Sequence, residues 1–329
     1  MKTGDACLTI YDIRYTKKKE EIEMFKGSLV AMITPFTKND EVDEKGIKEL
    51  VEFHIKNGTN GIVPCGTTGE SPTLSHEEHK RVVELTIKAV AGRVLVIAGT
   101  GSNCTREALD LTSHAKEAGA DGALIITPYY NKPTQKGLYL HFKKIAEEVD
   151  IPIVVYNVPS RTGVNILPET LAELAELKNI VAVKEASGNL DQMTHIVELC
   201  GDKITLLSGD DKLLLPVLSI GGKGVISVVA NIIPRDVSNM VREFEEGNYQ
   251  KSKEIFLSKV YPLSNAMFYE TNPIPVKTSA RLMGLPSGDL RLPLAPMSEN
   301  NLVKLKADLI KFGLLEPHSS NIECPPQEG

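Results

Sequence analysis

The sequence predicts an α/β protein, a (β/α)8 TIM barrel with a small C-terminal helical addition. Short apolar runs rich in Val and Ile alternate with amphipathic stretches, and about 20–35 residues separate each run from the next, eight times over. The length of 329 residues suits such a barrel with one appendage. A doubly wound open sheet is the alternative, but it usually has fewer strands, and no Gly-x-Gly-x-x-Gly motif opens a β-α-β unit here.

The apolar runs are the expected strands. Each is short and apolar on both faces, as strands buried on both sides of a parallel sheet are. The expected strands are Leu29–Thr34, Gly61–Pro64, Val94–Ala98, Ala123–Thr127, Ile153–Tyr156, Ile180–Lys184, Ile204–Leu207 and Gly224–Val228.

The stretches between the runs have helical periodicity and helix-end residues. Asp43 can serve as an N-cap, and Asn57 with Gly58 predicts the end of the same helix. Helical spacing also recurs after the eighth run, at Leu302, Leu305, Leu309 and Phe312. We therefore expect an N-terminal extension without fixed structure (residues 1–23), a catalytic barrel (24–247), a C-terminal helical region (248–316) and a polar tail (317–329).

Composition limits the classes of function. The net charge of −6 gives no general attraction to nucleic acid or anionic membranes, and no apolar run approaches the roughly 20 residues of a membrane span. The five cysteines include no Cys-x-x-Cys pair, which favours reduced thiols and a cytoplasmic location. His76 and His79 lie three residues apart rather than the four of the zinc motif, so no metal is expected.

Barrel enzymes carry their reactive groups at the carboxyl ends of the strands. Lys184 closes an apolar run, so its amine should point into the barrel mouth, where desolvation lowers its pKa and favours attack on a carbonyl. The alternative is a lysine that reaches solvent at a strand end.

Five further residues lie at or just after the carboxyl ends of other expected strands. Tyr156 and Tyr130 could relay protons, or simply pack at the barrel rim. Thr67 and Thr68 could present hydroxyls and N–H groups to a small carboxylate, or form an ordinary turn. Arg161 could bind a second carboxylate, or form a surface ion pair.

These residues belong to segments that resemble the dihydrodipicolinate synthase family of the N-acetylneuraminate lyase superfamily. The likeness runs from about Met24 to Leu315, and the segments that carry it are GTTGES, AGTGSN, TPYYNKP, YNVPSRTG, KEASGNL, LSGDD, GVISV and NPIPVK. The resemblance implies that Lys184 forms an imine with pyruvate and that Tyr156 relays protons. Thr68 would connect Tyr156 to Tyr130, which this family contributes across a subunit interface, and Thr67 and Thr68 would hold the pyruvate carboxylate.

The resemblance also implies a second substrate, L-aspartate 4-semialdehyde. Arg161 would bind its carboxylate, while Gly209 and Ile226 would line the pocket. The product would be 4-hydroxy-tetrahydrodipicolinate, in lysine biosynthesis through diaminopimelate, with no metal or organic cofactor because the lysine imine is the electron sink. A neuraminate or 2-keto-3-deoxy-sugar-acid aldolase on the same scaffold, and a non-catalytic metabolite sensor, are the alternatives.

Regulation and assembly are implied by the same likeness. Lysine-inhibited members bind L-lysine at a subunit interface, and the residues here that match that site are Ser71, His76, His79, Asn103, Glu107 and Tyr129. Pro72 stands where alanine is common, which leaves sensitivity to lysine open, and an ordinary polar interface is the alternative. The family is usually a homotetramer built from tight dimers.

Overall fold

The computed structural model describes residues 18–317 of the chain. Within that range, eight parallel strands form a closed barrel whose strand order follows the chain. The barrel prediction is therefore confirmed, and the open-sheet alternative is wrong. The strands are β1 (Gly27–Ala31), β2 (Gly61–Val63), β3 (Leu95–Gly99), β4 (Gly122–Ile126), β5 (Ile153–Asn157), β6 (Ile180–Glu185), β7 (Thr205–Ser208) and β8 (Gly224–Ser227).

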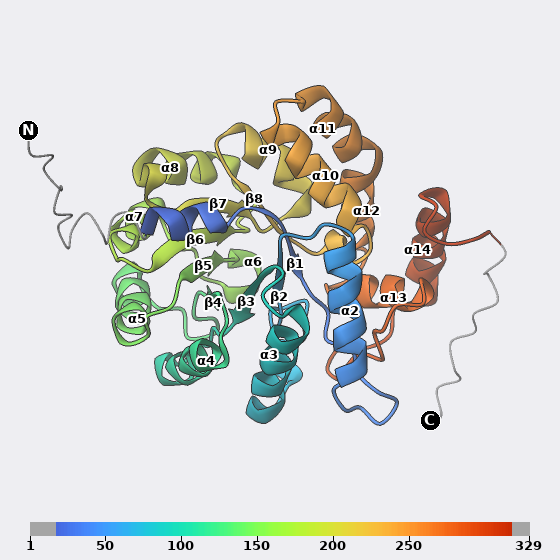
Figure 1. Cartoon of the computed structure of the whole chain (residues 1–329), viewed down its shortest axis with the longest axis horizontal. Helices are drawn as coiled ribbons and strands as arrows, with labels where there is room; N and C mark the ends of the chain where they lie inside the picture. Colours follow the sequence, from blue (N-terminus) through green and yellow to red (C-terminus); the bar gives the residue numbers. More distant parts are fainter. Residues whose placement is uncertain (1–17, 318–329) are drawn as a thin grey trace, which may run out of the picture. The chain divides into compact units, whose positions relative to one another are not determined.

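Helices alternate with the strands along the chain (Figure 1). In chain order these are α2 (Glu44–Lys56), α3 (His76–Val90), α4 (Thr105–Ala118), α5 (Gln135–Glu148), α6 (Pro159–Thr162), α7 (Pro168–Ala175), α8 (Leu190–Cys200), α9 (Leu214–Ser219) and α10 (Pro234–Glu245). The C-terminal region adds α11 (Tyr249–Ile255), the π-helical turn η5 (Phe256–Val260), α12 (Tyr261–Ala266), α13 (Ile274–Leu282) and α14 (Glu299–Lys311).

Local chemistry explains where these elements begin. The Asp43 side chain accepts a hydrogen bond from the Gly46 N–H at 2.9 Å, which confirms Asp43 as the N-cap of α2. Ser75 and Glu78 form a reciprocal capping box at the start of α3. Every residue of β5 and β6 is buried, as both faces of a parallel strand in a barrel require.

The chain divides into two compact units. The first comprises residues 1–27 and 95–226. Its described part begins with a helix over residues 18–24, of which residues 18–23 were expected to belong to an extension without fixed structure. The Lys18 amine donates to the carbonyl oxygens of Ala175 and Leu177 at 2.6 and 2.9 Å, so that helix is held at the end of α7. Residues 1–17 lie outside the described residues.

The second unit comprises residues 28–94 and 227–329. Asn231 joins its two segments: the side-chain amide donates to the Ala31 carbonyl at 2.8 Å and accepts from the Ile33 N–H at 3.1 Å. The region expected to be helical after residue 248 contains α11–α14, and Leu305 and Leu309 of α14 are fully buried. Residues 318–329, most of the expected polar tail, lie outside the described residues.

Candidate active site

Lys184 lies near the carboxyl end of β6, in the first unit, and is buried. Lys184 is only 5% exposed. Its Nζ atom lies 4.2 Å from the centroid of the Tyr156 ring on the neighbouring strand β5. The strand register pairs these two residues directly. The alternative of a lysine reaching solvent does not hold in this structure.

The charge state of Lys184 follows from this burial. Desolvation lowers the pKa of its amine to about 7, Asp211 opposes the shift, and the Arg161 guanidinium adds to it. An amine with a pKa near 7 is largely neutral at the upper end of the physiological pH range, as attack on a carbonyl carbon requires.

Gly209, which follows β7, leaves room beside Lys184. A Cβ atom at this position would lie 2.7 Å from the Ala186 Cβ and 3.2 Å from the Lys184 Cγ, too close for an ordinary contact. The Gly209 N–H donates to the Glu185 carbonyl at 2.7 Å, which fixes the backbone there. Ile226, the other residue expected to line a pocket, is a buried residue of β8.

The remaining expected groups of the first unit lie in the segments that follow β4 and β5. Arg161 is an exposed residue of α6, the short helix that follows β5. Tyr130 is 89% exposed in the single chain and has a left-handed backbone with φ of 69°. Its expected role across a subunit interface stays a prediction.

In the second unit, the loop after β2 (residues 64–70, the threonine loop) carries Thr67 and Thr68. Thr68 is 2% exposed, and its hydroxyl accepts a hydrogen bond from the Asn272 side-chain amide at 3.0 Å. Thr67 is half-buried. The Thr34 hydroxyl donates to the Gly69 carbonyl at 2.7 Å, so the loop is held from two sides.

A buried ion pair supports the same loop. Glu70, which adopts a left-handed backbone with φ of 54°, accepts a hydrogen bond from the Lys277 amine of α13 at 2.7 Å, and both side chains are almost inaccessible. The Arg291 N–H donates to the other Glu70 oxygen at 3.1 Å. Sequence reasoning assigned no role to Glu70 or Lys277, although GTTGES and NPIPVK contain them.

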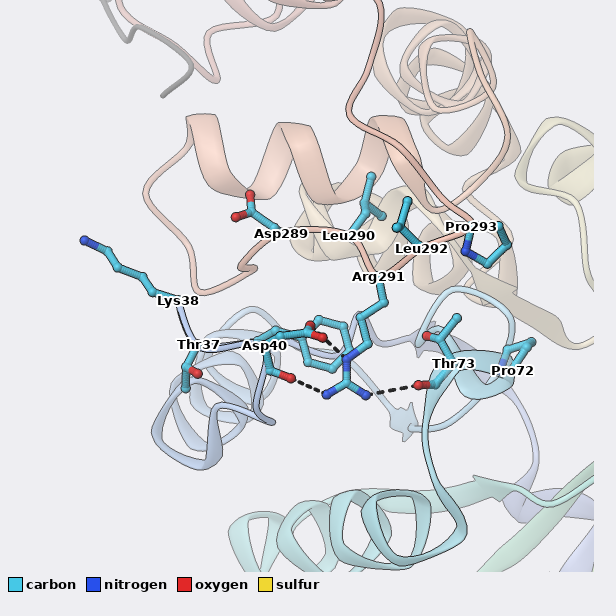
Figure 2. A pocket seen from close by; sticks show the side chains of 11 residues that line it. Thr37, Lys38, Asp40, Pro72, Thr73, Asp289, Leu290, Arg291, Leu292 and Pro293 are labelled. Carbon is cyan, nitrogen blue, oxygen red and sulfur yellow. Dashed lines mark hydrogen bonds and ion pairs between the residues drawn. The ribbon is translucent and has the colours of Figure 1, made fainter. Parts of the chain in front are cut away.

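Arg291 also forms hydrogen bonds with residues of neighbouring segments. Its guanidinium donates to the Asp40 carboxylate and to the Thr73 carbonyl, each at 3.0 Å (Figure 2), and to both Glu78 oxygens at 2.7 and 2.8 Å. Arg291, Asp40 and Thr73 line a pocket of about 600 Å³. Because the guanidinium already donates to several acceptors, we assign Arg291 a structural role.

The residues expected to bind L-lysine fall on both units. Ser71 lies in the 3-10 turn that follows the threonine loop, and His76 and His79 lie at the start of α3. In the first unit, Asn103 lies two residues before α4, Glu107 lies in the first turn of α4, and Tyr129 is on an exposed loop. The Asn131 side chain donates to the Asn103 carbonyl at 2.9 Å, and the Ser102 hydroxyl donates to the Glu107 carboxylate.

Residues 18–317 contain no cluster of three or more His, Cys, Asp or Glu side chains that could hold a metal ion. Over the same range, none of the helices is long and apolar enough to cross a membrane.

Comparison with known proteins identifies relatives over most of the chain. The model of the dihydrodipicolinate synthetase family matches residues 24–311. The 4-hydroxy-tetrahydrodipicolinate synthase of Geotalea uraniireducens is 59% identical, and the match covers 89% of this chain and all of that protein. The crystal structure of dihydrodipicolinate synthase from Aquifex aeolicus has a TM-score of 0.86 at 52% identity and covers 88% of this chain and 99% of its own. The lysine-bound enzyme of Cyanidioschyzon merolae has a TM-score of 0.86 at 41% identity, covering 89% and 99%.

Proposed function

Because this chain belongs to the dihydrodipicolinate synthetase family, we propose that it condenses pyruvate with L-aspartate 4-semialdehyde to give 4-hydroxy-tetrahydrodipicolinate, a precursor in lysine biosynthesis through diaminopimelate. The observation that carries the proposal is the buried amine of Lys184, whose pKa is lowered to about 7 beside the Tyr156 ring. The names of the relatives support this substrate pair over sugar acids.

The proposed reaction begins at Lys184. Its neutral amine attacks C2 of pyruvate, and loss of water gives a protonated imine. The imine draws electrons from the methyl group, which loses a proton to give an enamine. The enamine carbon attacks the aldehyde carbon of the semialdehyde. The amino group of the new adduct then attacks C2, displaces Lys184 and closes the ring. Since the imine is the electron sink, we propose no metal or organic cofactor.

The other residues would position protons and carboxylates. Tyr156 lies against the Lys184 amine, which supports its role in moving protons to and from the adduct. We propose that Thr68 and Tyr130 complete this relay and that Thr67 and Thr68 hold the pyruvate carboxylate. Arg161 would bind the carboxylate of the semialdehyde with its planar guanidinium, and Gly209 and Ile226 would line the pocket.

Borohydride trapping tests the nucleophile. Reduction in the presence of pyruvate should add one pyruvate-derived group per chain, and peptide mass spectrometry should locate it on Lys184. Lys184→Ala should give no adduct. Lys178→Ala is the matched control, because Lys178 precedes the same strand but is exposed and paired with Asp150. An unmodified mass, or a label on another lysine, would contradict the proposal. Faster cleavage of sugar acids than turnover of the semialdehyde would favour the aldolase alternative.

We also propose that L-lysine regulates the enzyme through the residues that match the family site, which are Ser71, His76, His79, Asn103, Glu107 and Tyr129. The lysine-bound relative supports this assignment. We expect L-lysine to lower turnover of the parent and to have little effect on Glu107→Gln, because the variant loses the carboxylate that would pair with the ligand amine. Equal inhibition of both proteins would argue against a role for Glu107.

We propose that the protein is cytoplasmic and forms a homotetramer built from two tight dimers. The cysteines of the described range, Cys65, Cys104 and Cys200, are free, which is typical of a reducing compartment.

A further inference from the structure

A buried amide at the end of β5 holds the loop that carries Arg161. Asn157, the residue after Tyr156, is fully buried. Its side-chain N–H groups donate to the Asn165 side-chain oxygen at 2.7 Å and to the Glu185 carboxylate at 2.9 Å. Its side-chain oxygen accepts from the Ile166 N–H at 3.1 Å. All the hydrogen-bonding groups of this amide therefore have partners within the first unit.

These bonds close the loop on itself. Asn157 stands at the start of the loop, and Asn165 with Ile166 stands at its end, so one side chain joins both ends around Arg161. Inside the loop, the Thr162 hydroxyl contacts the Val158 and Val164 carbonyl oxygens at 3.2 and 2.9 Å. A loop closed in this way has less conformational freedom, so the backbone beneath Arg161 is confined.

The same network reaches the strand of the nucleophile. Glu185 follows Lys184 in β6, and because successive strand residues point to opposite faces, its side chain leaves the barrel interior. One carboxylate oxygen accepts from the Ser187 N–H at 2.7 Å, and the other accepts from Asn157. Burial raises the pKa of the Glu185 carboxyl, and these hydrogen bonds oppose the rise.

A side-chain pair from α8 completes the network. Asn165 donates to the Gln192 side-chain oxygen at 2.8 Å, and Gln192 donates back to the Asn165 oxygen at 3.1 Å. The strands around the network consist largely of apolar residues, and a fully satisfied polar cluster buried among them makes the local arrangement rigid. The arrangement it fixes is that of the Arg161 loop relative to the end of β6.

We propose that Asn157 is a positioning residue for the second substrate: through Asn165 and Glu185 it sets the place of Arg161 relative to the Lys184 adduct. This inference rests on the proposed function, in which Arg161 binds the carboxylate of the semialdehyde. It assigns to Asn157 control over the use of the second substrate and not over capture of pyruvate.

Asn157→Ala tests the inference through a comparison of the two substrates. We expect the KM for the semialdehyde to rise about tenfold, because misplacing a binding group by a fraction of an ångström weakens productive binding. The rate of borohydride trapping with pyruvate should stay within about twofold of the parent, since the variant retains Lys184 and Tyr156. Asn165→Ala is a second, milder variant at a half-buried position and should shift the same KM in the same direction.

Asn179→Ala is the matched control. Asn179 is also buried, lies just before the other end of β6, and its amide donates to three carbonyl oxygens at 3.0–3.2 Å. If Asn179→Ala raised the semialdehyde KM by a similar factor, general destabilisation would explain the result for Asn157→Ala. That outcome would overturn the inference. A parent-like semialdehyde KM in both Asn157→Ala and Asn165→Ala would also overturn it.

Coupling to Arg161 gives a further readout that a purely structural role would not reproduce. In an Arg161→Ala background, adding Asn157→Ala should raise the semialdehyde KM no further, because the group that it positions is gone. Additive effects would contradict the inference. Failure of the proposed function is distinguishable: the parent would then form no adduct at Lys184, or Arg161→Ala alone would leave the semialdehyde KM unchanged.

Discussion

The amine of Lys184 is the single group on which the proposed chemistry depends, and its pKa of about 7 makes that chemistry dependent on pH. Only the neutral amine attacks pyruvate, so about half of the enzyme is competent at pH 7 and about a tenth at pH 6. The initial rate of borohydride trapping should therefore rise with pH and level off above about pH 8. A rate that continues to rise tenfold per unit up to pH 10 would show an ordinary lysine.

The neighbours of Lys184 should move this pH profile in opposite directions. Asp211 raises the pKa of the amine, so Asp211→Asn should shift the midpoint to lower pH. The Arg161 charge lowers the same pKa, so Arg161→Ala should shift the midpoint to higher pH. Each shift should be about one pH unit or less, as expected for one nearby charge. Shifts of the same sign would contradict this assignment of the charges.

Glycine is required at position 209 because β6 and the residue after it lie too close for a side chain. In Gly209→Ala, the added methyl group would overlap Ala186 and press on the Lys184 side chain. Overpacking of this kind costs about 1–3 kcal/mol, and displacement of the amine should slow trapping about tenfold. The measurement is the trapping rate at saturating pyruvate together with the unfolding midpoint. If the variant had the trapping rate and the unfolding midpoint of the parent protein, the site would accommodate the methyl group and the prediction would be wrong.

At the scale of elements, the sequence predicted what depends on local pattern. Runs of Val and Ile located all eight strands, and Asp43 located the start of α2. The helix over residues 18–24 was missed, because a run of charged residues resembles a solvated stretch and its support from Ala175 and Leu177 is distant in sequence.

The candidate site divides in the same way. Lys184 could be predicted because it closes an apolar run, and desolvation of its own buried amine lowers its pKa. The Asn157–Glu185 contact could not be predicted, because it joins side chains 28 positions apart whose pairing depends on the register of β5 and β6. The bond from Asn272 to Thr68 spans 204 positions and leaves no local pattern.

The buried ion pair joins Lys277 of α13 to Glu70 of the threonine loop. Removing one partner should destabilise the fold, because the other charge stays buried without compensation. Lys277→Met would leave the Glu70 carboxylate buried without its cation, which should cost about 3–5 kcal/mol in the free energy of unfolding. Chemical denaturation monitored by circular dichroism would measure the loss. Lys178→Met removes an exposed ion pair and should change little. Equal losses in the two variants would show that burial of the Lys277 pair does not matter.

At the scale of the whole molecule, the proposed role of Tyr130 requires a second copy of the chain. Tyr130→Phe should lower kcat by about 100-fold or more, as loss of one proton-transfer group does, and Lys184→Ala should abolish turnover. If Tyr130 acts in the partner's site, a dimer of these two variants has one site with both defects and one with neither. Co-refolded in equal amounts, the variants should recover about a quarter of the parent activity, because half of the dimers are mixed and each has one intact site.

The control for this complementation is the pair Lys184→Ala and Tyr156→Phe. Both changes lie within one chain's own site, where the Lys184 amine contacts the Tyr156 ring, so no mixed dimer of these variants contains an intact site. Their mixture should have no more activity than the average of the two proteins measured alone. If the Tyr130 mixture behaves in the same way as this control, Tyr130 acts within its own chain, and its 89% exposure in the single chain then has no explanation in a neighbouring subunit. Recovery confined to the Tyr130 pair would require that two copies of the chain build each site together.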